Sequence, residues 1–125
     1  MEPQVDYQWA LKERESLRGQ LLEWLEAVPL IVAPVGGGPA FEHGAQRLDF
    51  SGESVSVFRA FSYSQAFNVF DLPSVVVRAG HSAEGLPIGV QIVSRPFNER
   101  AILAAATIVE SALGGWQRTT RLEEL

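Results

Sequence analysis

The stretch GHSAEGLPIGVQIV, residues 80–93, decides the fold because turn residues lead directly into a β-branched run. Gly80 and Gly85 bound a turn, and Pro87 follows at once, a combination typical of a tight β-hairpin. The residues from 88 to 94 then read as a strand. Gly89 stands inside this strand, where the missing side chain lets a neighbouring element approach closely.

The segment before the turn, residues 74–78, is β-branched and reads as a second strand. The link between the two strands has no helical pattern and is too short for a parallel crossover. We therefore expect residues 74–78 and 88–94 to pair as an antiparallel hairpin, with residues 80–85 at its turn. On the amino-terminal side, Leu72-Pro73 ends a helix predicted over residues 57–69, because proline supplies no backbone donor.

Beyond the hairpin the pattern changes to that of a helix. Asn98 is predicted to cap this helix and Gly114 to end it, so that the block 57–113 reads as helix, hairpin and helix. The predicted apolar stripe of the second helix consists of Ile102, Ala105, Ala106, Val109 and Leu113. Residues 116–125 form a charged tail that we expect to be loose.

Upstream, the sequence predicts a first helix over residues 1–28, with Pro3 in its first turn and Pro29 at its end. Its apolar positions recur at three- and four-residue steps: Leu17, Leu21, Trp24, Leu25 and Val28. Residues 30–33 read as a short buried strand. Residues 36–53 show no clear periodicity and are predicted to form a long loop.

These elements predict an α/β fold in a single segment, residues 1–125, with about three helices and three strands including the antiparallel hairpin. Residues 30–33 and 75–77 are almost continuously apolar. Such strands are usually covered on both faces, as in the middle of a larger sheet. The sequence therefore predicts part of a larger structure.

Composition excludes several classes of partner and chemistry. The 125-residue chain has a formal net charge of -5, from 10 basic and 15 acidic residues, which argues against nucleic acid or an anionic membrane as a partner. It has no cysteine, which excludes disulfides and thiolate catalysis and fits the reducing cytoplasm. The first residues do not read as a signal peptide, and no apolar run is long enough to span a bilayer. We expect no cofactor and no metal.

No residues assemble a recognisable catalytic site. The run Gly36-Gly37-Gly38 lacks the lysine-serine ending of a phosphate-binding loop, which favours a plain turn. His43 and His81 lie in separate loops without a second ligand at metal spacing. Serines are plentiful, but none lies in a Gly-x-Ser-x-Gly elbow, and Lys12 falls on the charged side of the first helix. Nothing in the sequence indicates that pairs of carboxylates, such as Glu42 and Asp49, lie close together in the fold.

The hairpin sequence resembles the carboxy-terminal hallmark of the amidase signature family, in which Gly-Leu-Pro-Ile-Gly-x-Gln follows a strand and a turn. The residues that match are Gly85, Leu86, Pro87, Ile88, Gly89 and Gln91. Residues 67–74 are similar to the family's Asn-x-x-Gly-Leu-Pro-Ala segment, with Asp71 where glycine is usual. Residues 30–34 resemble its strand ending in Thr-Pro, with Ala33 in place of threonine.

The resemblance covers about residues 5–115 and implies a function for a complete protein. Enzymes of this family are several times longer, fold as an α/β/α domain around a large mixed sheet, and hydrolyse carboxamides with a Ser-Ser-Lys triad. Their triad lies in the amino-terminal half, and none of its members has a matching position here. Their carboxy-terminal part completes the sheet and walls the acyl pocket, for which Phe61, Phe67 and Asn68 are the candidates in this chain.

Two interpretations follow from this resemblance. In the first, the chain is a carboxy-terminal scaffold and pocket segment of an amide hydrolase, inactive alone, whose partner is an amino-terminal catalytic half or a second copy of itself. In the second, it is a free-standing interaction or regulatory module derived from the same fold. A small hydrolase with its own serine and histidine is a weaker third alternative, since no activation motif is present.

Overall fold

The computed structural model describes residues 6–50 and 52–116. No helix within these ranges combines the length and the apolar character needed to cross a lipid bilayer. The elements in chain order are α1 (Tyr7–Ala27), β1 (Ile31–Pro34), β2 (Arg47–Phe50), β3 (Glu53–Ser56), α2 (Val57–Ala60), η1 (Ser62–Ser64), α3 (Gln65–Val69), β4 (Ser74–His81), β5 (Pro87–Val93) and α4 (Glu99–Ala112).

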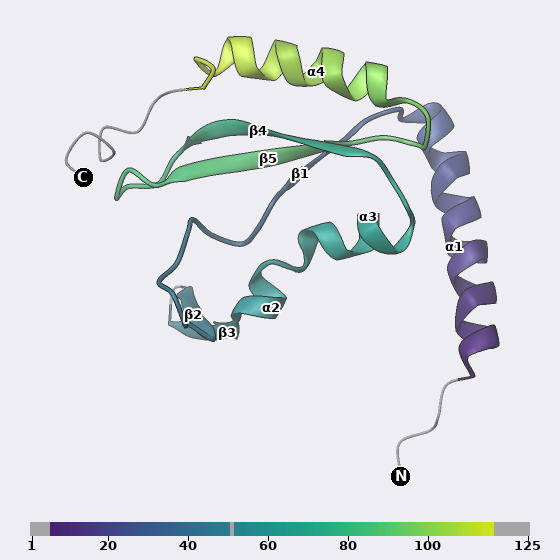
Figure 1. The fold of residues 1–125 in the computed structure, drawn as a ribbon, viewed down its shortest axis with the longest axis horizontal. Helices are drawn as coiled ribbons and strands as arrows, with labels where there is room; N and C mark the ends of the chain where they lie inside the picture. The colour runs from purple at the N-terminus through teal and green to yellow at the C-terminus, as the bar shows by residue number, and fades with distance from the viewer. Residues whose placement is uncertain (1–5, 51, 117–125) are drawn as a thin grey trace.

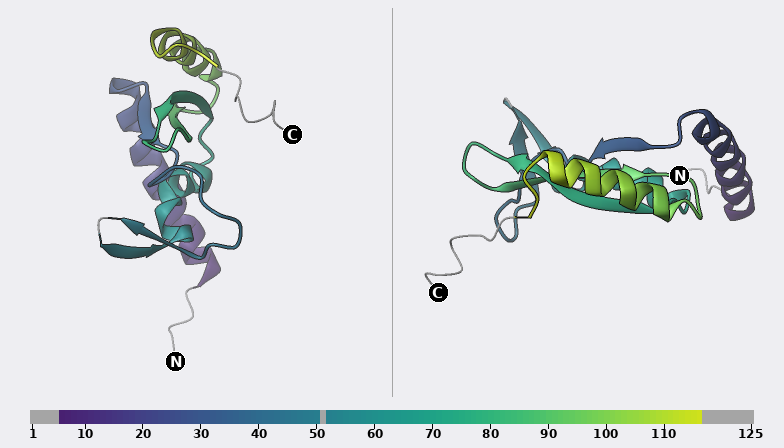
Figure 2. Two further views of the ribbon diagram at one scale, coloured as in Figure 1. Left: turned by 90° about the vertical axis from the view of Figure 1, so that its left-hand side faces the viewer. Right: turned by 90° about the horizontal axis from the view of Figure 1, so that it is seen from above.

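A three-stranded antiparallel sheet in the order β1-β5-β4 forms the centre of the fold (Figure 1). Helix α4 runs along one face of this sheet, while α2, α3 and the small β2–β3 hairpin lie on the opposite side (Figures 1 and 2). Helix α1 stands across one end of the sheet. The arrangement places β1 and β4 at the two edges of the sheet in the described part of the chain.

The antiparallel hairpin predicted from the sequence is confirmed. β4 pairs with β5 in a register that places Val77 opposite Val90, with an irregularity just after Arg78. Because β4 continues to His81, the turn is shorter than the predicted residues 80–85. Gly85 has a φ of 82°, a left-handed conformation that glycine adopts without strain, so its place in the motif is explained.

Two apolar clusters hold the elements together. On one face of the sheet, Ile92 of β5 packs against Ile102 and Ala106 of α4. At the end of the sheet, Leu25 of α1 is fully buried in a cluster with Val93 and Leu72. The partly buried residues around this second cluster are Leu21, Leu22, Ile31, Phe67 and Phe70. Thus α1, α3 and the sheet meet in the cluster at Leu25.

Cover on both faces, expected for residues 30–33 and 75–77, is incomplete within the described chain. The side chain of Val32 on β1 is 63% exposed, and that of Val76 on β4 is 56% exposed. Both belong to edge strands, whose outer hydrogen-bonding groups face no other described strand. Apolar side chains therefore point into solvent at both edges of the sheet.

The prediction of a long loop over residues 36–53 is wrong, because this segment contains β2 and the start of a second hairpin. β2 pairs antiparallel with β3, and Phe50 lies opposite Glu53. Gly52, at a φ of 91°, provides the tight turn between the strands. Leu48 and Phe50 alternate with polar neighbours along β2 and are less exposed than those neighbours. This alternation over residues 47–50 is the period-2 pattern of a half-buried strand.

The continuous helix predicted over residues 57–69 is also wrong. The segment is divided into α2, η1 and α3, with non-helical dihedral angles at Phe61 (φ -108°, ψ 25°). At this point, two backbone carbonyl oxygens that could accept helical hydrogen bonds accept them from other donors. The carbonyl oxygen of Ala60 accepts a hydrogen bond from the Gly37 amide at 2.6 Å, and that of Arg59 accepts one from the Ser62 hydroxyl at 2.8 Å. Competing donors of this kind interrupt a helix.

Helix α1 is capped by Asp6, whose carboxylate accepts a hydrogen bond from the Gln8 amide at 3.0 Å. The predicted start near Pro3 lies outside the described residues. The predicted stripe divides in two: Leu25 is buried and Leu21 partly buried, while the remaining members are exposed, at 49% for Leu17, 49% for Trp24 and 41% for Val28.

Asp71, which stands where the resembled family usually has glycine, adopts a left-handed conformation with a φ of 52°. Aspartate tolerates this region better than most residues. Arg14 of α1 forms an ion pair with Asp71 and donates a hydrogen bond to the Val69 carbonyl, and Arg18 donates one to the Phe70 carbonyl at 2.9 Å. The two arginines thus fasten α1 to the end of α3.

Helix α4 follows the sequence prediction except at its cap. Gly114 has a φ of 85° just after the helix, as expected for a terminating glycine. Asn98 stands at the N-cap position, but its side chain makes no capping hydrogen bond and instead donates to the Ser94 hydroxyl at 2.7 Å. The predicted tail lies outside the described residues, apart from Trp116.

Candidate functional site

The three pocket candidates chosen from the sequence occupy different surroundings. The ring of Phe61 packs against that of Phe41, with centroids 5.3 Å apart and planes at 54°. Phe67 packs against the core cluster at Leu25, and Asn68 is exposed on α3. None of the three lines the cavity between α2 and the β2–β3 hairpin or the one between α1 and α4.

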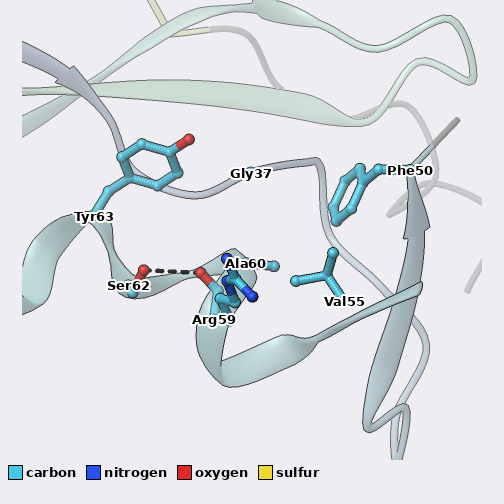
Figure 3. A pocket seen from close by; sticks show the side chains of 7 residues that line it. All are labelled: Gly37, Phe50, Val55, Arg59, Ala60, Ser62 and Tyr63. Atoms are coloured by element: carbon cyan, nitrogen blue, oxygen red, sulfur yellow. Dashed lines mark hydrogen bonds between the residues drawn. The ribbon is translucent and has the colours of Figure 1, made fainter. Parts of the chain in front are cut away.

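The first of these cavities, of about 470 Å³, lies beside Phe61, between α2 and the β2–β3 hairpin (Figure 3). Its lining residues are Gly37, Phe50, Val55, Arg59, Ala60, Ser62 and Tyr63. Phe50 and Val55 form one wall and Tyr63 stands at the other side, with Arg59 between them in Figure 3. The sequence did not single out these residues, although the alternation in β2 predicts which face of that strand turns inward.

The glycines before the β2–β3 hairpin let the chain approach α2 closely beside this cavity. A Cβ atom built on Gly36 would lie 2.3 Å from the ring of Phe61, and one on Gly37 would lie 3.0 Å from the carbonyl oxygen of Ala60. Each glycine is therefore a point of close approach between the chain after β1 and α2. This packing role replaces the plain turn expected for the run.

The second cavity, of about 480 Å³, lies between the end of α1 and the start of α4. It is lined by Leu25, Glu26, Pro29, Arg95, Asn98 and Ala101. Beside it, the buried Ser94 hydroxyl donates to the Pro29 carbonyl at 2.7 Å and accepts from Asn98. Ser94 thus joins β5, α4 and the turn before β1, which is a structural use of the hydroxyl.

The matched motif has a clear structural role. Gln91 is 3% exposed, and its side-chain amide donates to the Pro34 carbonyl at 2.7 Å. A Cβ atom on Gly89 would lie 3.1 Å from Val76, so this glycine permits the close packing predicted for it. The motif therefore fixes the hairpin to the end of β1, where the chain leaves toward the first cavity.

The described residues show no activated nucleophile. No serine hydroxyl within residues 6–50 and 52–116 forms a hydrogen bond with Lys12, His43 or His81. No group of three or more histidine, aspartate or glutamate side chains in these ranges is placed to hold a metal ion. A serine without a positioned base is a weak nucleophile near neutral pH.

The turn of the β4–β5 hairpin contains a shifted carboxyl group. A hydrogen bond from Ser82, and secondarily one from the backbone of Glu84 itself, hold the pKa of the Glu84 carboxyl below its ordinary value. Because the folded-state pKa is lowered, the carboxylate stabilises the turn above its ordinary pKa. This contribution is lost as the pH falls through the lowered pKa.

Replacing Ser82 with alanine should raise the pKa of Glu84 toward its ordinary value, because the largest cause of the shift is removed. NMR titration of the Glu84 side-chain carboxyl carbon measures the change. Ser82→Thr keeps a hydroxyl and should keep the pKa low. An unchanged pKa in Ser82→Ala would show that the hydroxyl does not cause the shift.

Comparison with known proteins agrees with the resemblance. The Amidase family model matches residues 2–103. A glutamyl-tRNA(Gln) amidotransferase subunit from Methylocella silvestris is 35% identical over 89 residues, which is 71% of this chain and 17% of that protein. Fatty-acid amide hydrolase 2-A of Danio rerio is 49% identical over 57 residues, 46% of this chain and 11% of that protein.

Solved structures give the same result at the level of the fold. The structure of 6-aminohexanoate cyclic dimer hydrolase superimposes with a TM-score of 0.76 at 28% identity, covering 93% of this chain and 26% of that one. The chain thus spans between about a tenth and about a quarter of the length of these proteins. Its helices and antiparallel strands form part of an α/β fold that these enzymes share. The match over residues 2–103 shows that the chain belongs to the amidase signature family of amide hydrolases.

Proposed function

We propose that the chain is the carboxy-terminal scaffold and pocket segment of an amide hydrolase that converts a carboxamide to a carboxylate and ammonia or an amine. The observation that carries the proposal is the motif at residues 85–91 in the β4–β5 hairpin, whose Gln91 side chain donates a hydrogen bond to the Pro34 carbonyl at the end of β1. In this proposal the chain lacks the Ser-Ser-Lys triad and is inactive alone.

The partner in this proposal is an amino-terminal catalytic half of the same family, acting in the cytoplasm on a small amide. The exposed Val32 and Val76 at the two edge strands support it, because further strands and the layers packed on their faces would cover such side chains in a larger fold. Self-association through the same edges is the second outcome, since unpaired strands promote it. Sedimentation of the purified chain distinguishes a monomer from self-associated forms.

The purified chain should show no turnover of small aryl amides or aryl esters, because none of its described serines has a base within hydrogen-bonding distance. Product release followed by absorbance is a sufficient measurement, with a complete amidase-signature enzyme as the positive control. Turnover that a single Ser→Ala substitution abolishes would contradict the proposal and favour a hydrolase with its own nucleophile.

A further inference from the structure

The guanidinium group of Arg59 is placed beside the first cavity without a protein partner. Among the described residues it has no hydrogen bond or ion pair. Its backbone, in contrast, is fixed on both sides: the amide donates to the Ser56 hydroxyl at 3.3 Å and the carbonyl accepts from Ser62 at 2.8 Å. The guanidinium group of Arg59 is therefore held near the first cavity by a fixed backbone and can bind a ligand there.

Several other arginines are used differently, whereas Arg95 and Arg100, like Arg59, have no side-chain hydrogen bond or ion pair among the described residues. Arg14, Arg18 and Arg47 each donate to backbone carbonyls, and Arg14 also pairs with carboxylates. These contacts fasten one element to another. Within the described part of the chain Arg59 makes no such contact, so its side chain has no evident role in holding the fold together.

The lining of the cavity suits an anion with an apolar body. Although the chain carries a net charge of -5, no acidic residue within residues 6–50 and 52–116 lines this cavity, and Arg59 is the single charged residue among the described lining residues. Phe50 with Val55 supplies an apolar wall, and Tyr63 stands opposite with its hydroxyl turned away from Arg59 (Figure 3). A charged group beside apolar side chains is typical of small-molecule sites, and about 470 Å³ lies within their usual size.

We propose that this cavity binds the carboxylate of a small organic acid, with Arg59 as the carboxylate ligand and the apolar body against Phe50 and Val55. A planar guanidinium matches a carboxylate with two parallel hydrogen bonds. The origin of the ligand rests on the proposed amide hydrolysis. The bound carboxylate is either the product of that reaction or a substituent of its amide substrate. The binding itself requires no catalysis.

Binding of benzoate to the full chain, followed by the NMR amide shifts of Gly37 and Ala60, tests the proposal. We expect saturable shifts with benzoate and none with benzamide, the neutral analogue of the same shape. Arg59→Gln should weaken benzoate binding about tenfold or more, the loss typical of a charged hydrogen bond. Arg100→Gln removes the same charge from an exposed position on α4 and should leave binding unchanged.

The remaining outcomes are also decisive. Arg59→Lys keeps the charge without the paired hydrogen bonds and should bind benzoate at intermediate strength. 4-Carbamoylbenzoate carries the same carboxylate beside an intact amide, so binding as tight as that of benzoate shows that a carboxylate-bearing amide substrate fits the cavity, and much weaker binding favours the product as the source. Equal binding of benzoate and benzamide, or benzoate binding unaffected by Arg59→Gln in a folded chain, would overturn the proposal. These measurements follow binding and not hydrolysis, so they would still test the carboxylate site if the amide-hydrolase proposal proved wrong.

Discussion

Leu25→Ala should destabilise the chain by about 2–5 kcal/mol, the usual range for a fully buried leucine. Leu25 is 0% exposed and lies where α1, α3 and the end of β5 meet. Removing its side chain leaves a cavity among elements distant in sequence, and local repacking cannot fill it easily. Urea unfolding followed by circular dichroism measures the loss.

Leu17→Ala is the matched control for this prediction. It makes the same chemical change in the same helix, but Leu17 is 49% exposed. We expect an effect below about 1 kcal/mol, as for most surface substitutions. Similar losses in both variants would show that the cluster at Leu25 does not hold α1 to the sheet.

Gly36→Ala should destabilise the chain by about 1–3 kcal/mol, the cost of forcing extra atoms into a packed site. The new Cβ atom would lie 2.3 Å from the ring of Phe61, which must move and lose its contact with Phe41. The approach of residues 36–37 to α2 would then be lost, together with the Gly37–Ala60 hydrogen bond.

Gly19→Ala provides a control of opposite sign. A Cβ atom on Gly19 meets nothing within 4 Å, and the residue lies in the interior of α1. Alanine there should stabilise the chain by up to about 1 kcal/mol, because glycine is a poor helix former. Thermal unfolding of the two variants compares them directly. Stabilisation by both substitutions would contradict the close packing at Gly36.

The sequence predicted best those features that depend on neighbouring residues. The hairpin at residues 74–94 was predictable because glycines and Pro87 limit the chain locally, and Gly114 ended α4 for the same reason. The hairpin of β2 and β3 was missed, although Leu48 and Phe50 alternate with polar residues before Gly52. β2 has four residues, and an alternation of this length does not distinguish a strand from an irregular loop.

Features that depend on distant contacts were not predictable. The break at Phe61 depends in part on the hydrogen bond from the distant Gly37 amide to the Ala60 carbonyl, which no pattern within residues 57–69 indicates; Ser62 supplies the local competing donor. The first cavity also lies between segments that are distant in sequence. No local pattern therefore indicated that Arg59 would line it. The incomplete cover of Val32 was likewise not predictable, because it depends on the strand order, which places β1 at an edge of the sheet.

The central claim is that this chain acts as the carboxy-terminal scaffold of an amide hydrolase, and a fused chimera tests it most directly. Residues 6–116, which include the whole of α4, would replace the matching segment of an amidase-signature enzyme, and amide hydrolysis by the purified chimera would be measured. The controls are the host lacking its segment and the host rejoined to its own segment at the same junctions. We predict hydrolysis by the chimera and none by the host lacking the segment. A chimera that fails to fold or to hydrolyse amide, while the rejoined host does both, would contradict the claim.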